Sequence, residues 1–97
     1  MMVVGLGKPR PGVPMEKVFT KVREEVTMGW DLYSKGIFRQ LLYRHDEGGV
    51  VIIMEVKDMD EAKRITAKMP MVEAGLTEWE LIPVGPFTHF EALFPKE

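Results

Sequence analysis

The stretch Val50-Val51-Ile52-Ile53-Met54-Glu55-Val56 decides the fold of this chain. Its first five residues are all strongly apolar, so both sides of a strand built from them are apolar, which is typical of a central strand buried on both faces. The preceding Asp46-Glu47-Gly48-Gly49 is a turn sequence, because glycine adopts backbone angles that other residues resist. Residues 37–44, before that turn, are rich in aliphatic and aromatic side chains. The segment therefore predicts a β-hairpin.

Working outward from the hairpin adds two strands and two helices. A short strand is predicted at residues 2–6, followed by an irregular segment at 7–14 with three prolines and two glycines. A helix is predicted from Met15 to about Lys35, ended by Gly36. Asp58 and Glu61 form a capping-box pattern for a second helix that stops at Pro70, and a last strand covers residues 76–82. The order β-α-β-β-α-β predicts a ferredoxin-like α+β fold, in which a four-stranded antiparallel sheet carries two helices on one face.

The first helix shows a regular apolar pattern. Spacings of three and four residues place the apolar side chains on one side of the helix, which predicts that this side packs on the core. The positions are Val18, Phe19, Val22, Val26, Trp30 and Tyr33. The second helix is predicted to turn Ala62, Ile65 and Met69 inward.

Composition limits the classes of function. The 97 residues fit a single domain spanning 1–97, and the absence of cysteine excludes disulfides and thiolate metal sites. The net charge is −2 and no basic run is present, so we expect no nucleic-acid partner. No apolar run is long enough to span a bilayer and no secretory signal is visible, so we expect a cytoplasmic protein without a membrane partner.

Two helices cover only one face of the predicted sheet, so the other face needs a cover. We expect a second copy of the chain to supply it, giving a homodimer or a higher homo-oligomer; the alternative cover is the phenylalanine-bearing tail, alone or together with a second copy. The tail at residues 83–97 holds Phe87, Phe90 and Phe94. We expect this tail to pack on a neighbouring subunit or a sheet edge; the alternative is that it folds back on its own subunit.

Four short segments resemble the muconolactone isomerase family of the dimeric α+β barrel superfamily. They are Gly36-Ile37-Phe38-Arg39-Gln40-Leu41, Met54-Glu55-Val56, Glu61-Ala62 and Met69-Pro70-Met71. The resemblance implies two facing ferredoxin-like sheets and an isomerase of aromatic compound catabolism that moves a proton within a small unsaturated lactone or related cyclic acid. It implies no metal and no organic cofactor. The same superfamily leaves two alternatives open: a non-catalytic oligomer that binds a small ligand, and a cofactor-free quinol monooxygenase.

Glu55 and Arg39 are the catalytic candidates. Glu55 shares a sheet face with Val51 and Ile53, and a carboxylate desolvated there becomes a stronger base; the alternative is that it reaches solvent or an ion pair at the strand end. Arg39 matches a motif position of the family and suits a two-pronged contact with a substrate carboxylate. Its alternative role is an ion pair with Glu78 or Glu80 of another subunit.

Trp79, His89 and Tyr33 are the candidates for substrate binding. Trp79 alternates with Glu78 and Glu80, which places its ring on the opposite sheet face, at an interface or a cavity wall. His89 stands between two phenylalanines in the tail, where a structural role is the alternative. Tyr33 belongs to the apolar side of the first helix, so core packing is its alternative. His45 and His89 lie far apart in the sequence, so no metal site is expected.

Overall fold

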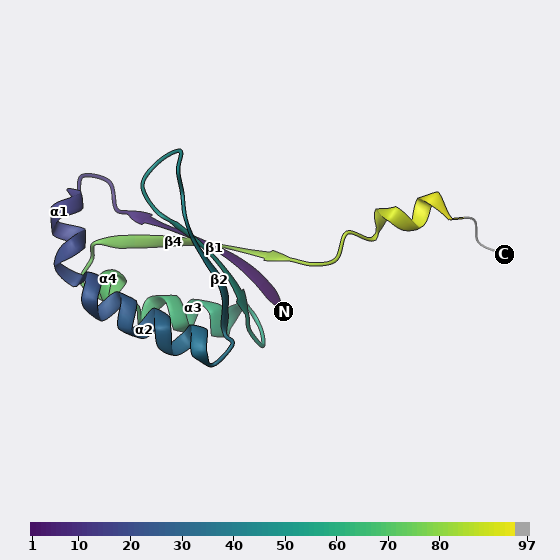
Figure 1. The fold of residues 1–97 in the computed structure, drawn as a ribbon, viewed down its shortest axis with the longest axis horizontal. Coiled ribbons are helices and arrows are strands. Elements are labelled where there is room, and N and C mark those ends of the chain that lie inside the picture. The colour runs from purple at the N-terminus through teal and green to yellow at the C-terminus, as the bar shows by residue number, and fades with distance from the viewer. Residues whose placement is uncertain (95–97) are drawn as a thin grey trace.

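The computed structural model describes residues 1–94 and has an α+β fold (Figure 1). A four-stranded antiparallel sheet carries all the helices of the domain on one face. The elements, in chain order, are β1 (Met2–Pro9), α1 (Met15–Val18), the 3-10 helix η1 (Phe19–Lys21), α2 (Val22–Ser34), β2 (Phe38–Tyr43), β3 (Val50–Glu55), α3 (Met59–Ala67), α4 (Pro70–Glu73), β4 (Thr77–Val84) and the 3-10 helix η2 (Thr88–Leu93).

The strand order is β2-β3-β1-β4, so β1 and β3 occupy the centre of the sheet. This confirms the predicted ferredoxin-like arrangement. Along β3, Ile52 and Met54 are buried beneath the helices, whereas Val51, Ile53 and Glu55 point to the open face. The core between sheet and helices includes Val3, Phe38, Met54, Ala62 and Met69. The apolar stretch therefore forms a central strand because one half of its side chains fills this core.

Local signals place several element ends where the sequence predicts them. The Asp58 carboxylate accepts the backbone N–H of Glu61 at 2.8 Å and thereby caps α3. Glu61 accepts the backbone N–H of Lys57 at 3.1 Å in return. Gly36 ends the first helical segment with φ +78°, which a residue with a Cβ resists. Pro70, predicted as a stop, also begins α4 at its first turn, where its missing N–H costs nothing.

The clearest differences from the predicted boundaries are in β1 and in the first helix. Strand β1 continues past Leu6 to Pro9, because Lys8 and Pro9 pair with Glu78 and Thr77 of β4. The single helix predicted from Met15 is interrupted by η1.

The predicted inner side of the first helix is correct for Val18, which is buried, and wrong for the residues that follow it. Trp30 is 69% exposed and Tyr33 is 46% exposed, and their rings lie 5.8 Å apart on the outer surface. The core contact is made instead by Gly29 and Leu32, both buried. On the same side of α2, the Glu25 carboxylate accepts the backbone N–H of Met71 at 3.0 Å and joins α2 to α4.

Residues 85–94 form an arm that leaves the domain beyond the end of β4 (Figure 1). The longest dimension of the chain is 60 Å, against 29 and 20 Å for the other two. The described part of the tail thus makes no return to the domain, its packing on a neighbouring subunit stays a prediction, and residues 95–97 lie outside the described residues. Among the helices of the described part, none has the length and apolar character needed to cross a membrane.

Candidate functional site

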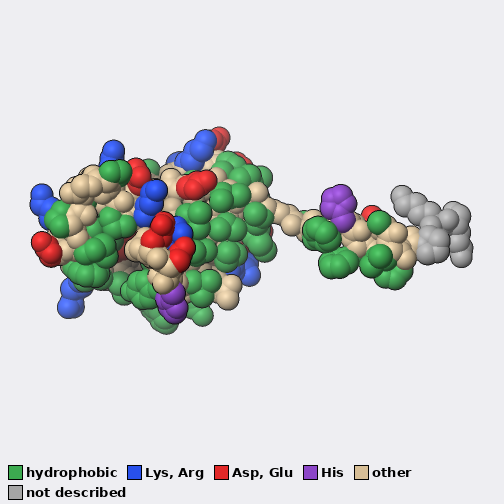
Figure 2. Space-filling model, turned by 90° about the horizontal axis from the view of Figure 1, so that it is seen from above, with side chains coloured by type: hydrophobic (Ala, Val, Ile, Leu, Met, Phe, Trp, Pro, Cys, Tyr) green, Lys and Arg blue, Asp and Glu red, His purple; other side chains and the backbone are tan. Residues whose placement is uncertain are grey.

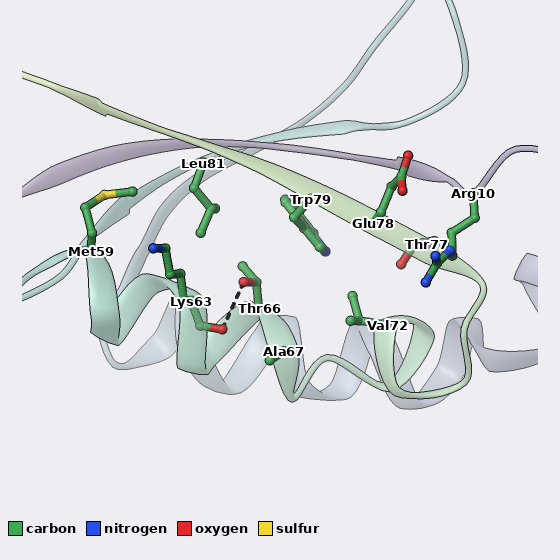
Figure 3. A pocket seen from close by; sticks show the side chains of 10 residues that line it. All are labelled: Arg10, Met59, Lys63, Thr66, Ala67, Val72, Thr77, Glu78, Trp79 and Leu81. Carbon is green, nitrogen blue, oxygen red and sulfur yellow. Dashed lines mark hydrogen bonds between the residues drawn. The ribbon is translucent and has the colours of Figure 1, made fainter.

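A cavity of about 400 Å³ lies between β4 and the helices α3 and α4 (Figure 3). Its apolar wall comes mainly from Met59, Ala67, Val72 and Leu81. The volume is in the range of small-molecule sites, which are apolar hollows with a few placed polar groups. The polar residues of the lining are Arg10, Lys63, Thr66, Thr77, Glu78 and Trp79.

Two polar atoms of β4 in this cavity have no partner. The hydroxyl oxygen of Thr77 and the indole Nε1 of Trp79 are buried and make no hydrogen bond within the described chain. Thr77 is only 8% exposed. A buried polar group without a partner costs about 1–3 kcal/mol, so two of them along one strand lower the stability of the fold, and other contacts offset this cost.

The indole of Trp79 lies flat on β1, and two glycines make this possible. A Cβ on Gly7 would come within 2.8 Å of the indole ring, and one on Gly5 within 3.1 Å. Any side chain at these positions would push Trp79 toward the cavity. The glycines of the first strand therefore shape the wall of the site.

Two basic side chains stand at the two ends of the cavity, with Trp79 between them (Figure 3). Arg10 is next to Thr77, where its backbone N–H is bonded to the carbonyl of Leu76 at 2.9 Å. Lys63 belongs to α3, near Met59 and Leu81. Neither forms an ion pair within residues 1–94. An elongated ligand with an acceptor at each end fits this distribution of charge.

The other polar groups of the lining are already engaged or turned away. The Thr66 hydroxyl donates to the carbonyl of Ala62 at 3.0 Å. The Glu78 carboxylate projects from the opposite side of β4, away from the cavity (Figure 3). Across the described residues, no group of three potential metal ligands is present. The remaining polar groups of the lining, without a partner among the described residues, are therefore hydrogen-bond donors, on Arg10, Lys63, Thr77 and Trp79.

The open face of the sheet is a second large feature, and Figure 2 looks onto it. Apolar side chains cover most of this face, and charged ones gather toward one end (Figure 2). The strand register aligns the apolar residues in adjacent rows, namely Met2, Val4, Leu6, Leu42, Val51, Ile53, Ile82 and Val84. At the charged end, a hollow of about 240 Å³ is lined by Lys8, Arg44, Glu78 and Glu80, among others.

Arg44 at that end is already paired with its own loop. Its guanidinium contacts the carboxylates of Asp46 and Glu47, each at 2.8 Å. The hydrogen bond from Arg44 lowers the pKa of Asp46 to about 2. This pairing fixes the hairpin loop.

Glu55 lies on the open face as predicted, but at its margin. Its side chain is 43% exposed, and the carboxylate receives the amino group of Met1 at 3.0 Å. The alternative of an ion pair at the strand end describes this geometry, and the expected desolvation is not observed in the single chain.

The other predicted residues lie apart from one another. Arg39 is exposed on the edge strand β2, where its Nε donates to the carbonyl of Gly36. Tyr33 is on the outer side of α2, and His89 is in the arm against Phe87, with a ring separation of 5.3 Å. Of the five candidates, Trp79 lines the main cavity.

Three lining residues were missed by sequence reasoning. Thr77 had a usable signal, since it alternates with Trp79 and shares its side of the predicted strand. Arg10 sits in a proline-rich segment and Lys63 is one of several basic residues on a helix, so no local pattern singles them out.

The model of the YCII-related domain matches residues 31–88, more than half of the chain. The chain belongs to the YCII-related domain family. The matched region of this YCII-related protein runs from the end of α2 to the start of the arm and includes β4 with Thr77 and Trp79.

One solved structure shares the fold of this chain. The fold is similar to that of the 5-chloro-2-hydroxyhydroquinone dehydrochlorinase TftG from Burkholderia phenoliruptrix AC1100, solved in complex with 2,5-dihydroxybenzoquinone. The TM-score is 0.67 at 19% identity, over 92% of this chain and 98% of TftG. The likeness confirms the predicted ferredoxin-like α+β fold.

A second structure, an uncharacterized NIPSNAP-like domain protein from Burkholderia xenovorans, aligns with 90% of this chain and 88% of its own. Its TM-score is 0.46 at 17% identity. A search of curated proteins gives no significant match.

Proposed function

We propose that this YCII-related protein is a cofactor-independent enzyme that moves a proton within a small cyclic acid, in the manner of an isomerase acting on an unsaturated lactone. The observation that carries this proposal is the pair of unpartnered donors, the Thr77 hydroxyl and the Trp79 N–H, in a cavity of about 400 Å³. Donors arranged before the substrate arrives stabilise negative charge that develops on an oxygen during the reaction.

Four polar residues of the cavity have a role in this proposal. Arg10 holds the carboxylate of the substrate. The ring carbonyl accepts hydrogen bonds from Thr77 and Trp79, which stabilise the enolate formed when a proton leaves the adjacent carbon. Lys63 is the basic side chain on the helix side of the cavity, and in this proposal its amino group carries the proton from the first carbon to a second one. The proton count is unchanged, so no co-reactant is needed.

The shape of the cavity supports a ring with acceptors at both ends. Arg10 and Lys63 are separated by the indole of Trp79, whose face offers a stacking surface for a planar ring. TftG binds 2,5-dihydroxybenzoquinone, a ring with oxygens on opposite sides. The similarity of fold makes compounds of this type suitable first ligands. The proposal keeps Trp79 as a binding residue and assigns chemistry to Lys63 and Arg10 in place of Glu55 and Arg39.

One observation favours a second function, which is binding without catalysis. The Glu78 carboxylate points away from the cavity, so no acidic side chain in the lining serves as a strong base. A site with donors and cations alone binds an anion whether or not it is converted.

We also propose that a second copy of the chain covers the open face. The eight apolar residues of that face form a continuous surface of the kind that soluble proteins cover by association. A face-to-face pair of sheets would bury this surface and enclose the charged end with Lys8, Glu78 and Glu80. The two facing sheets of the barrel superfamily support this arrangement.

Turnover and binding are tested together. The chain has two tryptophans, so Trp30→Phe leaves Trp79 as the one reporter of ligand binding by fluorescence. A panel of muconolactone, related lactones and hydroxylated cyclic acids is then titrated and assayed for double-bond migration. Lys63→Arg retains positive charge, so we expect binding to persist and turnover to be lost. Binding without turnover in the parent protein supports the second function, and absence of both contradicts the site.

A further inference from the structure

Two exposed apolar features of this chain remain unexplained by the cavity and the open face. The first is the α2 stripe, defined as Phe19, Val22, Val26, Trp30 and Tyr33, whose exposed fractions run from 40% to 69%. The second is the arm, residues 85–94, whose large side chains Phe87, Phe90, Leu93 and Phe94 are 64% to 74% exposed. We propose that the arm of one copy docks on the α2 stripe of a second copy.

The arm presents a single apolar ridge. Residues three apart eclipse one another in a 3-10 helix, so Phe87, Phe90 and Leu93 lie on the same side of η2. The rings of Phe87 and Phe90 are already packed edge to face with centroids 5.0 Å apart. No other side chain of the domain covers this ridge, because the arm points away from it (Figure 1). The ridge is thus ordered for contact with another molecule.

The α2 stripe matches the ridge in length and chemistry. From Val22 to Tyr33 the stripe extends roughly 16 Å at the rise of an α-helix. From Phe87 to Phe94 the ridge extends roughly 14 Å at the rise of a 3-10 helix. Trp30 and Tyr33 offer a tilted aromatic pair for the rings of the arm.

Opposite charges beside the two apolar surfaces would fix the orientation of the arm on the α2 stripe. Arg23 precedes Val26 and Trp30 by three and seven residues, so it flanks the stripe. Glu91 lies in η2, beside the ridge. Within residues 1–94, neither Arg23 nor Glu91 takes part in an ion pair. Docking brings opposite charges to the rim of the contact.

The open face is a less suitable docking surface for the arm than the α2 stripe. It is broad, it is the surface that a second sheet would cover, and it lies on the side of the sheet opposite to the helices (Figure 1). The α2 stripe is on the outside of the helix layer and stays uncovered when two sheets meet face to face. It therefore needs an occupant of its own.

The α2 stripe is also less accessible to the arm of its own chain than to the arm of a second copy. The arm starts from β4, and α2 packs over β2, which forms the opposite edge of the sheet. Pro83 and Pro86 stiffen the exit from β4, since proline fixes its backbone angle. An arm that continues outward meets another molecule before it can return.

The area is sufficient for a stable pair. Aromatic side chains bury roughly 150–250 Å² each, so one arm and the stripe it covers bury roughly 1,000 Å² together. Two reciprocal arms bury roughly 2,000 Å², which reaches the usual size of specific interfaces. Reciprocal exchange between two copies also closes the assembly.

Cysteine crosslinking tests the contact directly, because the full-length chain has no cysteine of its own. Val26→Cys and Phe90→Cys are prepared as separate proteins, mixed and oxidised. Both sites are more than 60% exposed, so the domain keeps its fold. We expect a covalent heterodimer of the two variants as the main product. Lys68→Cys, exposed on the other helix pair, is the matched control and should give several-fold less product with Phe90→Cys.

Three results overturn the proposal. One is an absence of heterodimer above the Lys68 control. Another is a monomeric internal disulfide as the main product of the Val26→Cys/Phe90→Cys double variant, which would place the arm on its own chain. The third is a Leu42→Cys partner that captures Phe90→Cys better than Val26→Cys does, which would place the arm on the open face. None of these readouts depends on turnover, so they stand apart from the enzymatic proposal.

Discussion

Thr77 and Trp79, two residues apart on β4, turn an unpartnered hydroxyl and an unpartnered indole N–H toward the same side of the strand. Neighbouring cavity residues use their hydrogen-bonding capacity differently: the Thr66 hydroxyl is satisfied by its own helix. Under the proposed function, this difference makes β4, rather than α3, the wall of the cavity that binds the ligand. Because the unpartnered groups of β4 cost stability, changing them should have opposite effects on the stability of the fold and on ligand binding.

Thr77→Val should affect stability and binding in opposite directions. The substitution keeps the shape of the side chain and removes the buried unpartnered hydroxyl, so the free energy of unfolding should rise by up to about 1 kcal/mol. Affinity for a cyclic acid should fall about tenfold with the loss of a donor. Urea unfolding and fluorescence titration in the Trp30→Phe background measure the two effects. A parallel loss of stability and affinity would instead mean that Thr77 has a structural role.

Gly7→Ala should disturb the cavity from β1, the strand that pairs with β4. Its new Cβ would stand 2.8 Å from the indole of Trp79, and such overpacking costs about 1–3 kcal/mol. Ligand binding should weaken because the indole is displaced. Gly48→Ala is the control, since a Cβ there meets no atom within 4 Å. Thermal unfolding compares the two variants, and equal effects would exclude the contact with Trp79 as the cause.

Glu25 should make folding less favourable as the pH rises. Burial, the larger effect, raises the pKa of Glu25 above its usual 4.5, and the hydrogen bond from Met71 partly opposes this shift. Because the folded pKa is raised, the contribution of Glu25 to stability is fully present below pH 4.5 and is lost as the pH rises through the folded value. Glu25→Gln keeps an acceptor for Met71 and cannot ionise.

Urea unfolding of the parent and Glu25→Gln proteins at pH 4 and pH 7 checks this sign. The variant should gain stability relative to the parent on going from pH 4 to pH 7. A relative loss over that interval would show that the charged carboxylate is favoured in the folded state.

Leu42→Glu should dissociate the proposed sheet-to-sheet pair. Leu42 lies on the open face opposite Val51, and a carboxylate buried between two sheets is costly. The adjacent residue Tyr43 is 79% exposed and points to the other side of β2, so Tyr43→Glu is the matched control. Light scattering coupled to size exclusion should show a lower mass for Leu42→Glu alone. An unchanged mass for both variants would argue against an interface at this face.

Glu55→Gln should have a small effect on both stability and turnover. The pair of Glu55 with the Met1 amino group is substantially exposed, and exposed pairs contribute about 0.2–1 kcal/mol. Glu55 does not line the cavity with Trp79. A loss of turnover with unchanged stability would restore Glu55 as a catalytic residue and would move the site to the open face.

Patterns confined to neighbouring residues predicted the fold well. The apolar run before Glu55 identifies a central strand, and the Asp58–Glu61 cap and Gly36 mark helix ends through contacts made within a few residues. Such signals act before any long-range contact forms, so they can be recognised in the sequence itself.

The direction in which α2 turns could not be predicted in this way. Its stripe, with Val26, Trp30 and Tyr33, has the periodicity of a buried side, but periodicity does not identify what the side packs against. The tertiary structure turns Gly29 and Leu32 inward and leaves the stripe exposed. The same limit applies to the cavity, where Arg10, Lys63 and Thr77 come from three separate segments.

The sequence by itself determined the order of the strands and helices, the central position of β3 and the need of the open face for a cover, because these follow from local hydrogen bonding and side-chain alternation. Only the tertiary structure decided that Trp79 rests on Gly5 and Gly7, that its N–H and the Thr77 hydroxyl stay unpartnered, and that the arm projects from the domain. These features depend on contacts between segments that are distant in the chain, and the energies of such contacts leave no periodic trace in the sequence.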